Sequence, residues 1–77
     1  MNIKQLKYFL VVAEERQITS AAKKLYIAQP PLSRQIQNLE AELDIQLFER
    51  GSRPLKTTEA GQFFYQHAVK LLSNAEE

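Results

Sequence analysis

Residues 18–43 read ITSAAKKLYIAQPPLSRQIQNLEAEL, and this stretch decides the fold. Its first part carries apolar residues at the spacing of one helix face: Ile18, Ala21, Ala22 and Leu25. Proline is tolerated only in the first turn of a helix, so Pro30 and Pro31 indicate that a second helix begins beside them. That helix runs to about Leu43, and a short turn over residues 25–28 precedes it. The pattern predicts a helix-turn-helix.

The second of these helices has two faces of different chemistry. Its apolar stripe consists of Leu32, Ile36, Leu39 and Leu43. The opposite face carries amide, hydroxyl and guanidinium groups, which read base edges and grip phosphates in DNA. This face comprises Pro30, Ser33, Arg34, Gln37 and Asn38.

Two interpretations stay open for the long polar side chains of this helix. Gln29, at the helix start, could offer its amide to adenine or be an ordinary terminal polar residue. Arg34 could contact guanine or a phosphate, or it could pair with Glu40 or another acid.

The sequence on either side extends this unit. Residues 3–13 repeat apolar side chains with helical spacing, and Asn2 is suited to cap that helix. Two short runs, 45–48 and 55–57, flank a Gly/Ser/Pro turn and predict a hairpin. Thr58 can cap a last helix. We therefore expect a mainly α fold, a winged helix-turn-helix with a three-helix core, a two-stranded wing and a long C-terminal helix.

The last helix predicts a second chain as a partner. From Thr58 onward it would be about 30 Å long, close to the diameter of the domain, so its end should project beyond the core. We expect Phe63 and Phe64 to pack in the core. An apolar stripe without an intramolecular partner is typical of a dimer interface. The expected dimer contacts are Phe64, Ala68, Leu71, Leu72 and Ala75.

The composition excludes several classes of function. A chain of 77 residues is one small domain and cannot enclose a large catalytic pocket beside its core. Cysteine is absent and there is one histidine, so no disulfide, thiolate metal site or histidine cluster is expected. No set of residues typical of a hydrolase or nuclease is present. We expect no enzyme activity, no cofactor, no metal, no membrane span and a cytoplasmic location.

The net charge of +1 conceals two basic stretches. No acidic residue lies between Arg16 and Leu39, or between Arg50 and Thr58. The basic residues of these stretches are Arg16, Lys23, Lys24, Arg34, Arg50, Arg53 and Lys56. Local field rather than total charge decides binding to phosphates, so a fold that joins the two stretches predicts a nucleic-acid-binding face.

The residues also resemble a known family. The segments concerned are Leu6-Lys7-Tyr8-Phe9, Ala21-Ala22, Ile27-Ala28-Gln29-Pro30, Leu32-Ser33-Arg34-Gln35-Ile36, Leu39-Glu40, Leu47-Phe48-Glu49-Arg50 and Thr58-Glu59-Ala60-Gly61. In this order they resemble the N-terminal DNA-binding domain of LysR-type transcriptional regulators. The strings AQPPLSRQIQNLE and ERGSRP are most similar to regulators of aromatic-compound catabolism, such as those of benzoate and catechol operons.

The resemblance implies roles for individual residues. The helix that begins at Gln29 would enter the major groove, and the wing would reach the minor groove of a double-stranded operator in a bacterial promoter. The implied DNA contacts are Gln29, Pro30, Pro31, Ser33, Arg34, Asn38, Arg50, Ser52, Arg53 and Lys56. Residues 1–58 would form the DNA-binding domain and residues 59–77 a linker helix that makes a homodimer, with higher oligomers in a full-length protein.

The sequence departs from the family pattern in three places. Ala28 and Gln17 stand where relatives often have a serine cap, which predicts weaker helix starts by about 0.5–2 kcal/mol each. The effector-binding domain is absent from this chain, so any small aromatic-acid-derived effector would act elsewhere. The alternative function is a helical protein-interaction module that does not bind DNA. Such a module would need neither the polar helix face nor the basic wing, so these two features distinguish the two functions.

Overall fold

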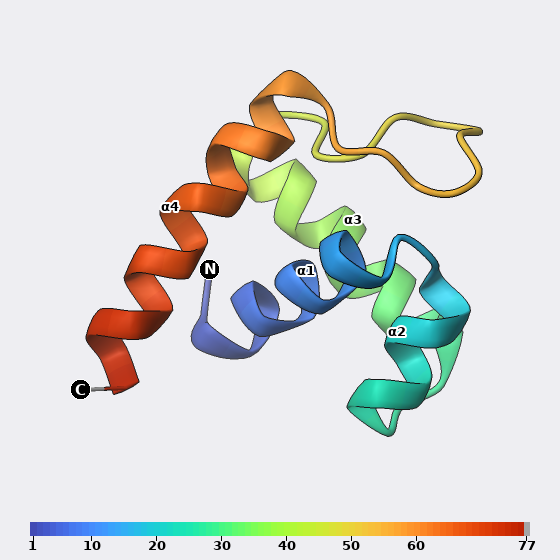
Figure 1. Ribbon diagram of the computed structural model, residues 1–77, viewed down its shortest axis with the longest axis horizontal. Helices are drawn as coiled ribbons and strands as arrows, with labels where there is room; N and C mark the ends of the chain where they lie inside the picture. The colour runs from blue at the N-terminus through green and yellow to red at the C-terminus, as the bar shows by residue number, and fades with distance from the viewer. Residues whose placement is uncertain (77) are drawn as a thin grey trace.

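The computed structural model describes residues 1–76, and their side chains up to residue 73. It contains four helices, which are α1 (Ile3–Glu15), α2 (Ile18–Leu25), α3 (Gln29–Leu43) and α4 (Glu59–Glu76). Figure 1 shows α1 at the centre, with α2 and α3 on one side and α4 on the other. The mainly helical fold and the helix-turn-helix of α2 and α3 are confirmed.

The helix ends follow local rules. Asn2 caps α1, because its side chain accepts from the backbone N–H of Gln5 at 2.8 Å and the Gln5 side chain accepts from the Asn2 N–H at 3.3 Å. Neither Gln17 nor Ala28 makes a side-chain cap, as expected, and the weaker helix starts that this implies stay a prediction. Ser20 instead donates to the Gln17 side-chain oxygen at 3.3 Å.

The first three helices each end on a residue in the left-handed conformation. Arg16, Tyr26 and Asp44 have φ values of 61°, 57° and 56°. Glycine commonly occupies this position, because other residues are strained there. A long side chain at the end of a helix can contact a neighbouring segment, as the Arg16 side chain contacts Leu55.

The core is built around an aromatic residue of α1. Phe9 is fully buried, and its ring lies 5.5 Å from that of Phe48 and 5.3 Å from that of Phe64. Tyr65 packs at the edge of this cluster, with its ring centroid 6.4 Å from that of Phe9. Because α1 also packs against α2 and α3, it joins the helix-turn-helix to α4.

Residues 45–57 form the segment that we call the wing. In place of the expected pair of strands, this segment contains one antiparallel bridge between Phe48 and Thr57, next to a hydrogen bond from the Glu49 N–H to the Lys56 carbonyl at 2.8 Å. Gly51 turns the chain with φ of 76°. Most of the wing is therefore a loop closed by a short ladder.

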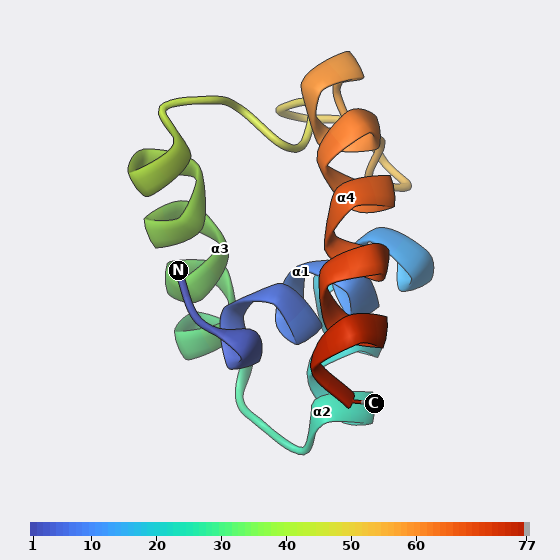
Figure 2. The same cartoon turned by 90° about the vertical axis from the view of Figure 1, so that its left-hand side faces the viewer.

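The packing of α4 corrects two expectations about its apolar residues. Leu72 does not project beyond the core, because its side chain is buried against the body of the chain together with Phe64 and Ala68. Phe63 is not a core residue, since 75% of it is exposed. Consecutive residues of a helix lie about 100° apart, so Phe63 and Phe64 cannot share one face. Figure 2 shows α4 passing in front of α1, which crosses behind it.

The start of α4 is fixed by close contacts with the wing. Thr58 caps the helix as expected, since its hydroxyl accepts from the Gly61 N–H at 2.9 Å and donates to the Gln46 carbonyl. A Cβ at Gly61 would lie 2.0 Å from the carbonyl oxygen of Leu47. Only glycine therefore lets the first turn of α4 approach the wing this closely.

Candidate nucleic-acid interface

The outer face of α3 is polar and exposed. Gln29 is the first residue of α3, and it lies in solvent with Pro30 and Pro31. Arg34 and Asn38 are also exposed, whereas Ser33 is half-buried. The opposite face is held in the core by Leu32, Ile36 and Leu39. Because that apolar stripe packs in the core, the exposed residues among the predicted contacts point away from the core.

Arg34 is not neutralised within the chain. Its alternative partner, Glu40, instead accepts hydrogen bonds from the backbone N–H groups of Leu47 at 2.6 Å and Phe48 at 3.3 Å. Within residues 1–73, no acidic side chain forms an ion pair with Arg34. The proposed Arg34–Glu40 pair is therefore wrong, and the guanidinium is available to a ligand.

The wing carries three more cations of this kind. Arg50, Arg53 and Lys56 are exposed, and no carboxylate within the described side chains pairs with them. Ser52 differs, because its hydroxyl donates to the Glu49 carbonyl at 3.0 Å and accepts from the Lys56 N–H at 3.1 Å. The observed role of the Ser52 side chain is thus to shape the turn.

The wing and the helix-turn-helix border common hollows. One lies between α3 and the wing and includes Ser33, Gln37 and Arg50 in its lining. Another lies between the start of α2 and the wing tip and includes Thr19 and Arg53. Figure 1 shows the wing extending away from the C-terminal end of α4. The structure thereby joins the two basic stretches on one side of the molecule.

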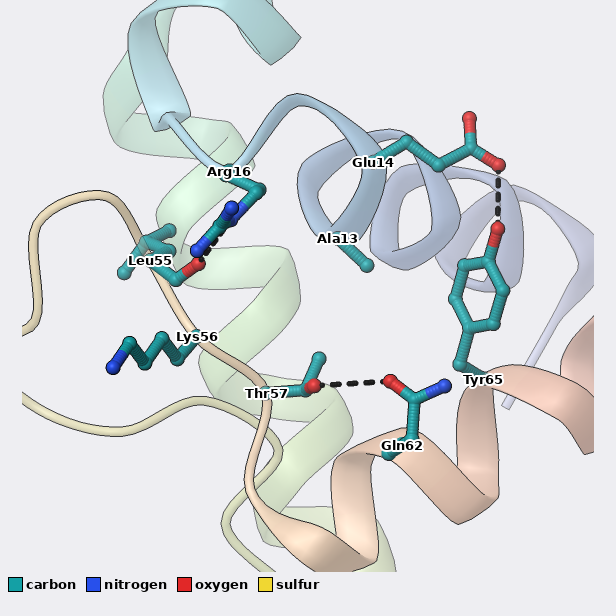
Figure 3. A pocket seen from close by; sticks show the side chains of 8 residues that line it. All are labelled: Ala13, Glu14, Arg16, Leu55, Lys56, Thr57, Gln62 and Tyr65. Atoms are coloured by element: carbon teal, nitrogen blue, oxygen red, sulfur yellow. Dashed lines mark hydrogen bonds between the residues drawn. The ribbon is translucent and has the colours of Figure 1, made fainter.

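The sequence did not predict that Arg16 contacts the wing. Its carbonyl accepts from the Leu55 N–H at 2.8 Å, and its Nε donates to the Leu55 carbonyl at 3.3 Å (Figure 3). These residues lie 39 positions apart, and no local pattern links them. The only signal was the place of Arg16 at the start of an acid-free stretch.

The hollow in Figure 3 also contains a tyrosine–carboxylate contact. The hydroxyl of Tyr65 donates to Glu14 at 2.8 Å, which ties α4 to the end of α1. This hydrogen bond, with partial burial and the negative charge of Glu14, raises the pKa of Tyr65 above its usual value of 10.0.

Some of the other cations have partners within the described residues. Lys24 pairs with Glu15 at 2.8 Å, and the hydrogen bond and charge of that carboxylate raise the pKa of Lys24 above 10.5. The N-terminal ammonium pairs with Glu42, and the ammonium of Lys4 lies 5.9 Å from the ring centroid of Tyr8. These contacts set the paired cations apart from those of α3 and the wing.

The described residues contain no group of three or more His, Cys, Asp or Glu side chains that could hold a metal ion. None of their helices has the length and apolar character required to cross a membrane.

The fold and the exposed basic face define a helix-turn-helix protein of the DNA-binding type. Residues 3–62 match the family described as bacterial regulatory helix-turn-helix protein, lysR family. The chain therefore belongs to the LysR family of bacterial regulators, which confirms the resemblance. The family is not an enzyme family.

Several relatives match the whole chain, and two of them come from Acinetobacter species. It is 66% identical over 77 residues to the HTH-type transcriptional regulator BenM of Acinetobacter baylyi, covering 25% of that protein. It is 49% identical over 77 residues to the probable cat1 operon transcriptional activator of Acinetobacter lwoffii, again covering 25%. The chain thus spans a quarter of the length of these relatives.

Several solved structures of similar size contain DNA. The complex of the BenM DNA-binding domain with benA site 1 DNA has a TM-score of 0.96 and 67% sequence identity to this chain. The match covers 99% of this chain and 85% of that one. At this identity the likeness extends beyond the fold to most side chains.

Proposed function

We propose that this chain binds double-stranded DNA with sequence specificity as the DNA-binding part of a LysR-type transcriptional regulator. The observation that supports this most directly is the row of exposed cations without acidic partners on α3 and the wing, namely Arg34, Arg50, Arg53 and Lys56. Neutralising phosphates with such cations releases counterions and drives association. The complex of the related BenM domain with DNA supports the same function.

In this proposal α3 lies in the major groove. Gln29 offers its amide to adenine, and Arg34 donates to guanine or to a phosphate. Pro30 and Pro31 contact thymine methyl groups and stiffen the helix start, whereas Ser33 and Asn38 contact the adjoining backbone. These contacts give the base preference.

The wing serves the flanking minor groove in the same proposal. Arg53, at its tip, enters the narrow groove, where the negative potential is strongest. Arg50 and Lys56 lie along the phosphates, and Ser52 holds the turn in shape. Residues 1–58 then act as the winged helix-turn-helix domain, and α4 acts as the linker.

We also propose that α4 forms a homodimer, through a revised set of residues. Phe64, Ala68 and Leu72 are buried in the chain itself, so they support α4 from behind and do not face a partner. Leu71 is 40% exposed, and with Phe63 and His67 it recurs every four residues on the free face. The side chain of Ala75, the last expected contact, lies outside the described residues.

The biological setting is carried over from the relatives. BenM and the cat1 operon activator suggest a bacterial regulator that activates a catabolic operon for aromatic compounds, acting in the cytoplasm on the nucleoid. A small aromatic-acid-derived effector would then bind outside these 77 residues.

In vitro selection of duplexes, followed by titration of the enriched duplex at increasing salt, tests the function. We expect a consensus with two half-sites and an affinity that falls steeply as salt rises. A scrambled duplex of the same length is the control and should bind with lower affinity. Failure to enrich any sequence, or binding that does not depend on salt, would favour a protein-interaction module instead.

A further inference from the structure

Two side chains of the helical body hold the wing, one on each arm. On the first arm, the Glu40 carboxylate accepts hydrogen bonds from the N–H groups of Leu47 and Phe48, at 2.6 and 3.3 Å. A carboxylate in the last turn of α3 is unfavourable for the helix dipole. The hydrogen bonds from the two wing N–H groups offset that cost, and through them the Glu40 carboxylate links α3 to the wing.

On the return arm, Arg16 makes a two-point contact with Leu55. The Arg16 carbonyl accepts from the Leu55 N–H at 2.8 Å, and its Nε donates to the Leu55 carbonyl at 3.3 Å (Figure 3). Arg16 has φ of 61°, a conformation that favours glycine. An arginine at this strained position gains what glycine cannot supply, a side chain that reaches the wing.

The base of the wing is also held by the core and by the start of α4, since Leu47 and Phe48 are buried and Thr58 contacts Gln46, whereas the tip, residues 49–54, is mostly exposed. Between the two arms there is one bridge, Phe48 to Thr57, flanked by the Glu49–Lys56 and Leu47–Thr58 backbone hydrogen bonds, and an isolated two-stranded hairpin is marginal in water. The tip residue Arg53 lies two positions before Leu55. The Glu40 and Arg16 contacts lie on the two arms that lead to this tip, so they contribute to the direction of Arg53 relative to α3.

We propose that Glu40 and Arg16 are positioning residues for DNA recognition, which set the wing so that Arg53 reaches the minor groove when α3 occupies the major groove. The proposal rests on the proposed DNA binding. Neither side chain needs to touch DNA, because each acts through the backbone of the wing. Their removal should weaken the flanking contact and leave the base preference of α3 intact.

The test compares binding to the selected duplex with binding to the same duplex carrying randomised flanks. We expect Glu40→Ala to weaken binding to the selected duplex about fivefold to tenfold, comparable to the loss of one charged contact, while binding to the randomised-flank duplex changes little. Glu40→Gln keeps an oxygen acceptor and should retain most of the affinity. Amide hydrogen exchange at Leu47 and Phe48 should accelerate in Glu40→Ala without DNA.

Arg16→Gly separates positioning from stability. Glycine suits the left-handed backbone, so this variant should melt no lower than the wild type, yet bind the flanks a few-fold more weakly. Asp44→Gly is the matched control, because it relieves the same backbone strain at the end of α3 without altering a wing contact. It should bind as the wild type does.

A double-mutant cycle that combines Glu40→Ala with Arg53→Ala tests whether Glu40 acts by positioning the wing or independently of it. If Glu40 acts through the wing, its effect on binding should largely disappear once Arg53 is removed. Additive effects, equal losses on both duplexes, or unchanged exchange at Leu47 and Phe48 would overturn the positioning role. Failure of the wild type itself to bind the duplex would instead overturn the proposed function.

Discussion

The side formed by α3 and the wing differs from the side formed by α1 and α4 in what its side chains contact. Arg34 and Arg53 are exposed and have no acidic partner among the described side chains. On the other side, Phe9 packs against Phe64, and Tyr65 donates to Glu14 at 2.8 Å. The exposed side chains of the first side can therefore change without loss of fold, whereas the packed side chains of the second stabilise the fold.

The largest effect on the packed side is expected from Gly61→Ala. The new methyl group would lie 2.0 Å from the Leu47 carbonyl oxygen, so the wing and α4 must move apart. We expect the free energy of unfolding to fall by about 3 kcal/mol, measured by urea denaturation.

Gly51→Ala is the control for this substitution. Gly51 has φ of 76°, but a Cβ there meets nothing within 4 Å. The variant should lose only about 1 kcal/mol from backbone strain. Equal losses for the two variants would show that the close approach of α4 to Leu47 does not matter.

On the exposed side, Arg34→Ala should affect DNA binding strongly and stability little. We expect binding to the selected duplex to weaken by about 1–3 kcal/mol with relaxed base preference, and stability to change by less than about 0.5 kcal/mol. Fluorescence anisotropy and thermal melting measure the two quantities.

Lys24→Ala is the matched control for the comparison of paired and unpaired cations. Lys24 is exposed like Arg34, but its ammonium is paired with Glu15. We expect its removal to leave DNA affinity almost unchanged. A loss as large as that of Arg34→Ala would mean that pairing within the chain does not distinguish the two groups.

The smallest effect concerns alkaline pH. Hydrogen bonding to Glu14 raises the pKa of Tyr65, so the folded state holds this proton more tightly than the unfolded state. The resulting stabilisation is complete below pH 10.0 and is lost as pH rises through the raised pKa.

Tyr65→Phe isolates this contribution, because it removes the hydroxyl and keeps the ring. Urea midpoints measured across alkaline pH should decline more steeply for the wild type than for Tyr65→Phe. Lys24, whose pKa is also raised, contributes in the same direction in both proteins and cancels in the comparison. Parallel curves would contradict the role of the Tyr65–Glu14 contact.

The sequence predicted the helices because their signals are local. Asn2 as the cap of α1, the prolines in the first turn of α3 and Thr58 before α4 all act within one helical turn. The predicted outer face of α3 followed from the apolar stripe opposite to it. The departure of Gln17 and Ala28 from the family pattern predicted the missing side-chain caps at the starts of α2 and α3.

The remaining features depend on contacts between distant segments. Leu72 was expected beyond the core because the sequence does not reveal the direction in which α4 leaves the wing. That direction is set by the contacts of Thr58 with Gln46 and of Gly61 with Leu47. The link from Arg16 to Leu55 spans 39 positions and has no sequence signature.

Hydrogen exchange with and without the selected duplex tests most directly whether the exposed side binds DNA. We predict that saturating duplex slows exchange in residues 29–38 and in residues 50–56, where α3 and the wing tip meet the grooves. Exchange in both segments that is unchanged at saturation would contradict the proposed binding face.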